Sequence, residues 1–258
     1  WIYEDNGVKE HIRDGFRDIF TSSFLSVPRV ALLASRWQAK LSDEERTSIS
    51  GIATEDEIRA ALWSLKDFKA PGPDGLHVGF FHRFWLIVRS SVSDEVKKVF
   101  VERRVPKYLN RTHITLIPKI QISETLGNYR PIILCNTVYK IVTKIIVARL
   151  RPFLDKLISP FQTAFVLGRR SIDNAIKAQV VIHSISKKRG KVTTWALIAL
   201  SILKVVIHSI SKKRGKVGYM VLKIDLEKAY DKLEWSCIRD ILFKVNLPLD
   251  LIEVIMSW

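Results

Sequence analysis

The sequence predicts an α+β protein in which helices dominate and one short antiparallel strand pair stands among them. The 258-residue chain is 47% hydrophobic, which suits one large core or two subdomains. Apolar residues recur at helical spacing in most segments. THITLIPKI (residues 112–120) is instead rich in β-branched residues, as strands are. We therefore expect helices throughout, and an antiparallel element around residues 112–135.

Several segments carry an apolar face with the period of an α-helix. The tetrapeptide TEDE (Thr54–Glu57) has the form of a capping box, which predicts that a helix begins at about residue 55 and ends near 66. The segment after Asp231 reads as a helix, a Leu-Pro turn and the start of another helix. The other predicted helices lie in VKEHIRDGFRDIF (8–20), HVGFFHRFW (77–85), VSDEVKKVF (92–100) and the stripe from Val138 to Leu150.

Turn signals connect these elements. KAPGPDGL (69–76) holds two prolines and two glycines, so it reads as a turn-rich loop. Gly127-Asn128 predicts a turn between the strand that ends at Lys119 and the segment NYRPI. Pro131 restricts Arg130 to an extended conformation, which suits a projecting side chain.

The chain is strongly basic, with a formal net charge of +16 and a pI of about 9.9. This predicts a polyanionic partner, with nucleic acid first and an anionic membrane surface second; a merely solvated basic surface is the alternative. Cys135 and Cys237 form no zinc spacing, which suits a reducing compartment. The apolar run 193–203 is too short to span a bilayer. We expect no membrane partner and an intracellular, nuclear or cytoplasmic, location.

One sequence unit occurs twice. VVIHSISKKRGKV stands at residues 180–192 and again, unchanged, at 205–217. Two identical copies are too few for a solenoid. They indicate a recent duplication or an error in the gene model, and we expect the additional 25 residues to lengthen a helix or form a loop.

Six stretches, in this order, resemble one family: KAPGPDG, LNRTHITLIPK, NYRPIIL, YKIVTKIIVARL, QTAFVLGRRSIDN and KIDLEKAYDKLEW. Together they are similar to the fingers and early palm of a LINE-type (non-LTR) retrotransposon reverse transcriptase, with the plant branch nearest. The resemblance implies the right-hand polymerase fold, truncated before the remaining palm and the thumb. The expected regions are an N-terminal helical extension with a linker (1–53), the fingers (54–179), the duplicated basic segment (180–217) and the start of the palm (218–258).

VLKIDL alternates apolar and polar residues and so predicts a half-buried strand, with Asp225 near its end. A carboxylate there suits a hard cation, or else caps the following turn. The resemblance implies the first role: Asp225 and the carbonyl of Leu226 would help to hold two Mg²⁺ ions for nucleotidyl transfer. It also implies that Tyr230 is the steric gate that selects deoxynucleotides.

Cations in the other motifs suit polyanion binding. Lys119 and Arg130, at the ends of adjoining strands, are able to clamp a triphosphate, with Arg130 bidentate; the alternative is a pair of charges that protects a sheet edge. The family resemblance implies the clamp. Its expected partners are an RNA template, a DNA primer and deoxynucleoside triphosphates. Template contacts are predicted in two loops, at Lys69, Gly72, Gly168, Arg169 and Arg170.

The sequence contains no adjacent Asp-Asp pair, so the Tyr-x-Asp-Asp hairpin of the family is missing from it. The chain begins with Trp1 and ends at Trp258 in mid-pattern, which suggests a fragment. We therefore expect no polymerase activity from this chain alone. Two alternatives stay open: a non-catalytic nucleic-acid-binding remnant of a degenerate element, and a relative of group II intron maturases.

Overall fold

The computed structural model describes residues 5–21, 39–122, 125–159, 162, 166–170, 172 and 233–258. The chain divides into two compact units, one of residues 1–153 and 231–258 and the other of residues 154–230. The predicted strand with Asp225 and Leu226, the gate residue Tyr230 and the repeat at 180–217 lie outside the described residues.

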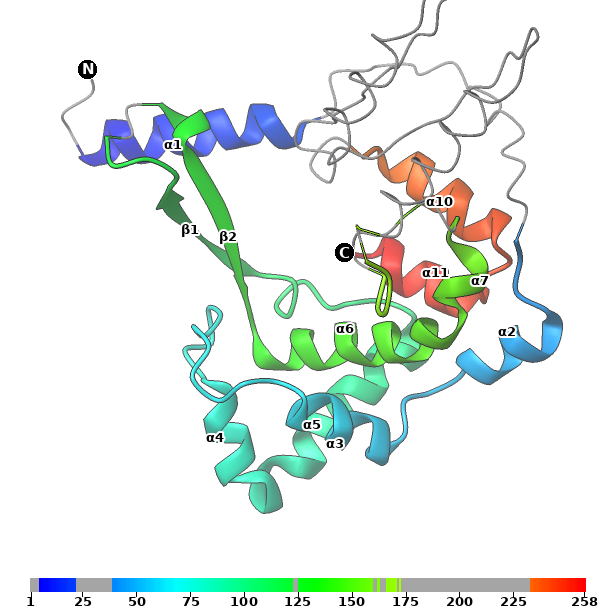
Figure 1. Ribbon diagram of the computed structural model, residues 1–258. Coiled ribbons are helices and arrows are strands. Elements are labelled where there is room, and N and C mark those ends of the chain that lie inside the picture. The colour runs from blue at the N-terminus through cyan, green and yellow to red at the C-terminus, as the bar shows by residue number, and fades with distance from the viewer. Residues whose placement is uncertain are drawn as a thin grey trace, which may run out of the picture. The chain divides into compact units, whose positions relative to one another are not determined.

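The first unit is mainly helical, as the sequence predicts (Figure 1). The segment expected to form helices after Asp231 does so, on both sides of Pro248. The helix expected at 92–100 is longer and begins at Trp85. The helices of this unit are α1 (Asp5–Phe20), α2 (Asp43–Ile49), α3 (Glu55–Trp63), α4 (Val78–Arg83), α5 (Trp85–Glu102), α6 (Thr137–Leu150), α10 (Trp235–Lys244) and α11 (Leu249–Met256), with 3₁₀ turns η1 (Leu126–Asn128) and η2 (Arg151–Phe153).

Two helices begin with the same reciprocal cap. At α3, Glu57 N–H donates to Thr54 Oγ1 over 3.2 Å, and Thr54 N–H donates to Glu57 Oε2 over 2.9 Å. This confirms the predicted capping box. Ser42 and Glu45 form the equivalent box at α2, a helix that the sequence prediction missed. Each box satisfies amide groups that would otherwise lack partners at a helix start.

The core of this unit lies where α3, α5, α6 and α11 pack together. Its members are aliphatic side chains that recur at helical spacing, so each helix turns one apolar face inward. Fully buried examples are Ile58 and Leu62 on α3, Val96 and Val99 on α5, Ile141 and Ile145 on α6, and Leu251 and Val254 on α11.

The strands β1 (Thr112–Pro118) and β2 (Tyr129–Cys135) form an antiparallel two-stranded sheet, at the position that the sequence predicts (Figure 1). Thr112 pairs with Cys135 at one end and Pro118 with Tyr129 at the other. Isoleucines on both faces are exposed, namely Ile114, Ile117, Ile132 and Ile133. A ribbon of two strands is marginally stable alone.

In the second unit the structure describes α7 (Leu154–Leu157) and short stretches up to residue 172. Across the described residues of both units, no helix has the length and apolar character needed to span a bilayer.

Candidate functional site

If the register of the hairpin is extended by one residue, Lys119 and Arg130 fall on one face. Arg130 pairs with Ile117, and Lys119 follows Ile117 by two residues. Lys119 N–H donates to the carbonyl of Asn128 over 2.7 Å, so the strand pairing continues one step beyond β1. Side chains two apart on a strand share a face, and diagonal neighbours across two strands lie about 7–8 Å apart. Two long cationic side chains at this spacing are able to converge on one polyphosphate.

Both cations are exposed to solvent. Lys119 Nζ donates to the carbonyl of Gly127 over 2.7 Å, which draws its ammonium group over the turn that closes the hairpin. Arg130 lies within β2, so its backbone is extended as Pro131 requires. The triphosphate clamp stays a prediction.

The loop of residues 69–76 is tied to the start of α6. Asn136, directly before α6, accepts a hydrogen bond from the amide of Asp74 at its Oδ1 (3.2 Å). Its Nδ2 donates to the carbonyl of Tyr108 (3.4 Å). Thr137 Oγ1 donates to the carbonyl of Leu76 (3.3 Å). The buried residues Asn136 and Thr137 thus hold the loop of residues 69–76, and Asn136 also holds the segment at Tyr108 that precedes β1.

Gly72 lies where this loop meets α6. A Cβ at Gly72 would stand 2.4 Å from Asn136 N and 2.5 Å from the carbonyl carbon of Cys135. Both are backbone atoms, which have little room to yield. The structure thus gives Gly72 a packing role, and its predicted contact with nucleic acid stays a prediction. Lys69 in the same loop is exposed.

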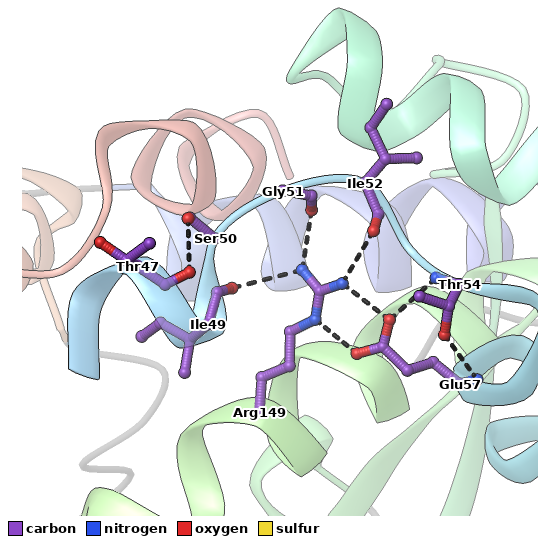
Figure 2. A network of polar contacts seen from close by, with 8 residues as sticks. All are labelled: Thr47, Ile49, Ser50, Gly51, Ile52, Thr54, Glu57 and Arg149. Atoms are coloured by element: carbon purple, nitrogen blue, oxygen red, sulfur yellow. Dashed lines mark hydrogen bonds and ion pairs between the residues drawn. The ribbon is translucent and has the colours of Figure 1, made fainter. Parts of the chain in front are cut away.

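Arg149, near the end of α6, binds the start of α3 and the loop after α2 (Figure 2). Its Nε and Nη2 donate to the two carboxylate oxygens of Glu57, at 2.6 and 2.8 Å. The remaining donors reach the carbonyls of Ile49 (3.3 Å), Gly51 (2.8 Å) and Ile52 (3.1 Å). The side chain of Arg149 is 8% exposed, and all five of its N–H groups have acceptors.

This network perturbs Glu57. The hydrogen bonds from Arg149 are the main reason that the pKa of Glu57 lies below its ordinary value, and Thr54 adds to the effect while burial opposes it. The arrangement is structural: it holds α3, α6 and the loop between α2 and α3 together. Sequence reasoning did not single out Arg149, because nothing near it in the chain is its partner.

In the second unit, Arg169 is held in a similar way. Its Nε donates to Asp155 Oδ1 (3.1 Å), and its Nη atoms donate to the carbonyls of Asp155, Ile158, Ser159 and Gln162 (2.6–3.2 Å). Three of these carbonyls lie in or just after α7, so Arg169 caps the end of this helix. In this arrangement Arg169 has no N–H left for a template phosphate. Gly168, at φ +82°, supplies the left-handed turn before it, and Arg170 is exposed.

The residues expected to hold metal and to gate the sugar lie outside the described part of the chain. Within that part, no group of three or more His, Cys, Asp and Glu residues is placed to hold a metal ion. His77 and His82 contact polar groups of the same chain: His77 Nδ1 lies 3.0 Å from the carbonyl of Lys69, and His82 Nδ1 lies 2.5 Å from Asp67 Oδ1.

Comparison with known families decides the class of protein. The profile of the family described as "Reverse transcriptase (RNA-dependent DNA polymerase)" matches residues 117–258, more than half of the chain. The chain belongs to the reverse transcriptase family. The matched region begins at the end of β1 and includes Lys119, Arg130, Asp225 and Tyr230. A reverse transcriptase domain implies a polymerase fold of fingers and palm, and the described part is helix-rich with one small sheet.

Two relatives come from transposable elements. The "Transposon TX1 uncharacterized 149 kDa protein" of Xenopus laevis is 28% identical over 184 residues, 70% of this chain and 14% of that protein. The "Retrovirus-related Pol polyprotein from type-1 retrotransposable element R1" of Bradysia coprophila is 28% identical over 121 residues, 46% of this chain and 12% of that protein. The expected LINE-type reverse transcriptase is thereby confirmed, and the plant branch stays a prediction.

Proposed function

We propose that this chain forms the nucleotide-entry and template-binding part of an RNA-directed DNA polymerase of a LINE-type element. Its substrates would be an RNA template, a DNA primer and deoxynucleoside triphosphates. The observation that supports the proposal is the hairpin register within the matched region, which pairs the exposed Arg130 with Ile117, two residues before the exposed Lys119. A lysine and an arginine there would bind the triphosphate, with the planar guanidinium contacting two oxygens at once.

The proposed roles in chemistry fall on residues outside the described part. Asp225, with the carbonyl of Leu226, would be one of the protein ligands for Mg²⁺, and Tyr230 would exclude a 2′-hydroxyl. When bound, two divalent ions would activate the primer hydroxyl and neutralise the leaving pyrophosphate. The sequence offers no adjacent Asp-Asp pair to complete such a site, so we propose that the chain alone does not polymerise DNA.

A second candidate function is a remnant that binds nucleic acid without chemistry. Both candidates predict binding to RNA that weakens as salt rises. They differ in nucleotide binding, because a remnant need not retain a triphosphate clamp.

Photolabelling with an azido-deoxynucleoside triphosphate, followed by peptide mapping, tests the clamp. We expect label on the peptide that spans β1 and β2, and we expect the Lys119→Gln/Arg130→Gln variant to lose most of it. Arg111→Gln is the matched control, because Arg111 is an exposed cation beside the other end of the hairpin. Equal labelling of the double variant and the wild-type chain would contradict the proposal and favour the remnant.

A further inference from the structure

Phe68 lies in the turn between α3 and α4 and is 92% exposed, more than any other large hydrophobic side chain in the described residues. Exposure of a whole aromatic ring forgoes the stabilisation that burial of its apolar surface would give. A single exposed ring is ordinary. The surroundings of Phe68 are what distinguish it.

The residues on both sides of Phe68 are anchored. Asp67 contacts His82 through its carboxylate, and its carbonyl accepts a hydrogen bond from Gly79 N–H over 3.3 Å. His82 is itself bound through Nε2 to the carbonyl of Leu62 at 3.1 Å. On the other side, the carbonyl of Lys69 lies 3.0 Å from His77 Nδ1. The backbone around Phe68 is thus held by side chains and an amide of α4 and of the residue before it.

The next residue is anchored as well. Lys140 Nζ, on α6, donates to the carbonyl of Ala70 over 3.3 Å. The ring of Phe68 therefore projects from a fixed turn, and binding to it would cost little ordering of the backbone.

Two cations flank this ring. Lys66 and Lys69 are exposed, and with Asp67 and Phe68 they line an open hollow. Surfaces that bind proteins are depleted of lysine. Surfaces that bind single-stranded nucleic acid combine cations for the backbone with aromatic rings on which bases stack. The turn at Phe68 has the composition of a surface that binds single-stranded nucleic acid.

We propose that Phe68 is a stacking platform for an unpaired base of single-stranded RNA, with Lys66 and Lys69 on the adjacent phosphates. The inference rests on the proposed function and deepens it, since it adds Phe68 and Lys66 to the template-binding residues. A base in a duplex is already stacked on its neighbours, so the platform acts on single strands.

Fluorescence anisotropy with a labelled single-stranded RNA tests this in the full chain. Stacking on an aromatic side chain is worth about 1–3 kcal/mol per base, so Phe68→Ala should weaken binding by about 5- to 150-fold, and Phe68→Trp should retain it. The loss should be confined to single strands and absent with a duplex of equal length. Lys66→Gln and Lys69→Gln should instead each reduce the slope of log affinity against log salt by about 0.7, because each variant leaves one phosphate without its lysine.

Leu86→Ala is the control, because Leu86 is 82% exposed and lies on α5. Equal affinities for the Phe68→Ala and Leu86→Ala variants would overturn the platform while leaving template binding in place. Failure of the wild-type chain to bind RNA would overturn both the proposed function and this inference. As a second readout, RNA that contains 5-iodouracil should crosslink under light to the peptide with Phe68, and crosslinks found solely elsewhere would overturn the platform.

Discussion

Arg149 donates two parallel hydrogen bonds to Glu57, from Nε to Oε1 at 2.6 Å and from Nη2 to Oε2 at 2.8 Å (Figure 2). The two residues are 92 positions apart in the chain. Glu57 also closes the capping box of α3, so one carboxylate links the start of α3 to the end of α6. The ring of Phe100, on α5, lies 5.2 Å beneath the guanidinium and adds a cation–π contact.

Removal of Arg149 should destabilise the first unit strongly. Arg149→Ala leaves the Glu57 carboxylate and three backbone carbonyls without this partner, and we expect the free energy of unfolding to fall by about 3–5 kcal/mol. The free energy of unfolding of Arg149→Lys should lie between those of the wild-type chain and Arg149→Ala, because lysine keeps the charge but lacks the planar fork of donors. The midpoint of urea unfolding measures the change. Arg151→Ala, at an exposed neighbour, should stay within about 0.5 kcal/mol; equal midpoints for both alanine variants would contradict the role of Arg149.

Acid should weaken this link. The pKa of Glu57 in the folded chain lies below its ordinary value of 4.5. A group with a lowered folded pKa contributes its full stability above the unfolded value and loses it as pH falls through the folded value. The difference in unfolding free energy between the wild-type chain and Glu57→Gln should therefore be constant near neutral pH and shrink below pH 4.5. Urea midpoints of both proteins between pH 7 and 3 measure this difference. A difference that does not change with pH would contradict the lowered pKa of Glu57.

Gly72 should not tolerate a side chain. Gly72→Ala places a methyl group against the backbone at Cys135 and Asn136, and overpacking of this kind costs about 1–3 kcal/mol. Gly127→Ala is the matched control, because the nearest atom to a Cβ there is Thr125 Oγ1 at 3.8 Å. We expect Gly72→Ala to lower the melting temperature clearly and Gly127→Ala to leave it nearly unchanged. Equal melting temperatures for the two variants would mean that the loop does not pack on α6 as described.

The hydrogen bonds of Arg169 should reduce local opening in the second unit. Arg169→Ala removes five hydrogen bonds to the described residues of the segment 155–162, namely Asp155, Ile158, Ser159 and Gln162. Local opening raises the rate of proteolysis, so proteinase K should cut the variant in this segment several times faster than the wild-type chain. Unchanged cleavage would show that these bonds do not restrain the segment.

Local signals predicted much of this fold. The box at Thr54 and Glu57, the Gly127-Asn128 turn signal and the abundance of β-branched residues in 112–120 depend on neighbours in sequence, so they predict α3 and the hairpin where they occur. The start of α2 carries the same signal at Ser42 and Glu45.

Long-range polar contacts could not be predicted in this way. Most acceptors of Arg149 are backbone carbonyls about a hundred positions away. Because every residue has a backbone carbonyl, the sequence does not indicate which ones accept. Asn136 likewise acts through the amide of Asp74 and the carbonyl of Tyr108. For the candidate site, the sequence predicted the hairpin that bears Lys119 and Arg130, whereas the bonds that occupy Arg169 became visible in the structure. The roles of Asp225, Leu226 and Tyr230 stay predictions.

The most direct test of the central claim is one gel experiment with a labelled oligo(dT) primer on poly(rA), deoxythymidine triphosphate and Mg²⁺ or Mn²⁺. The claim is that this chain is a nucleic-acid-binding part of a reverse transcriptase that does not polymerise alone. We expect the chain to retard the primer–template at low salt, to release it as salt rises, and to leave the primer at its original length. Primer extension that Asp225→Ala abolishes, or no retardation at any salt concentration, would contradict the account.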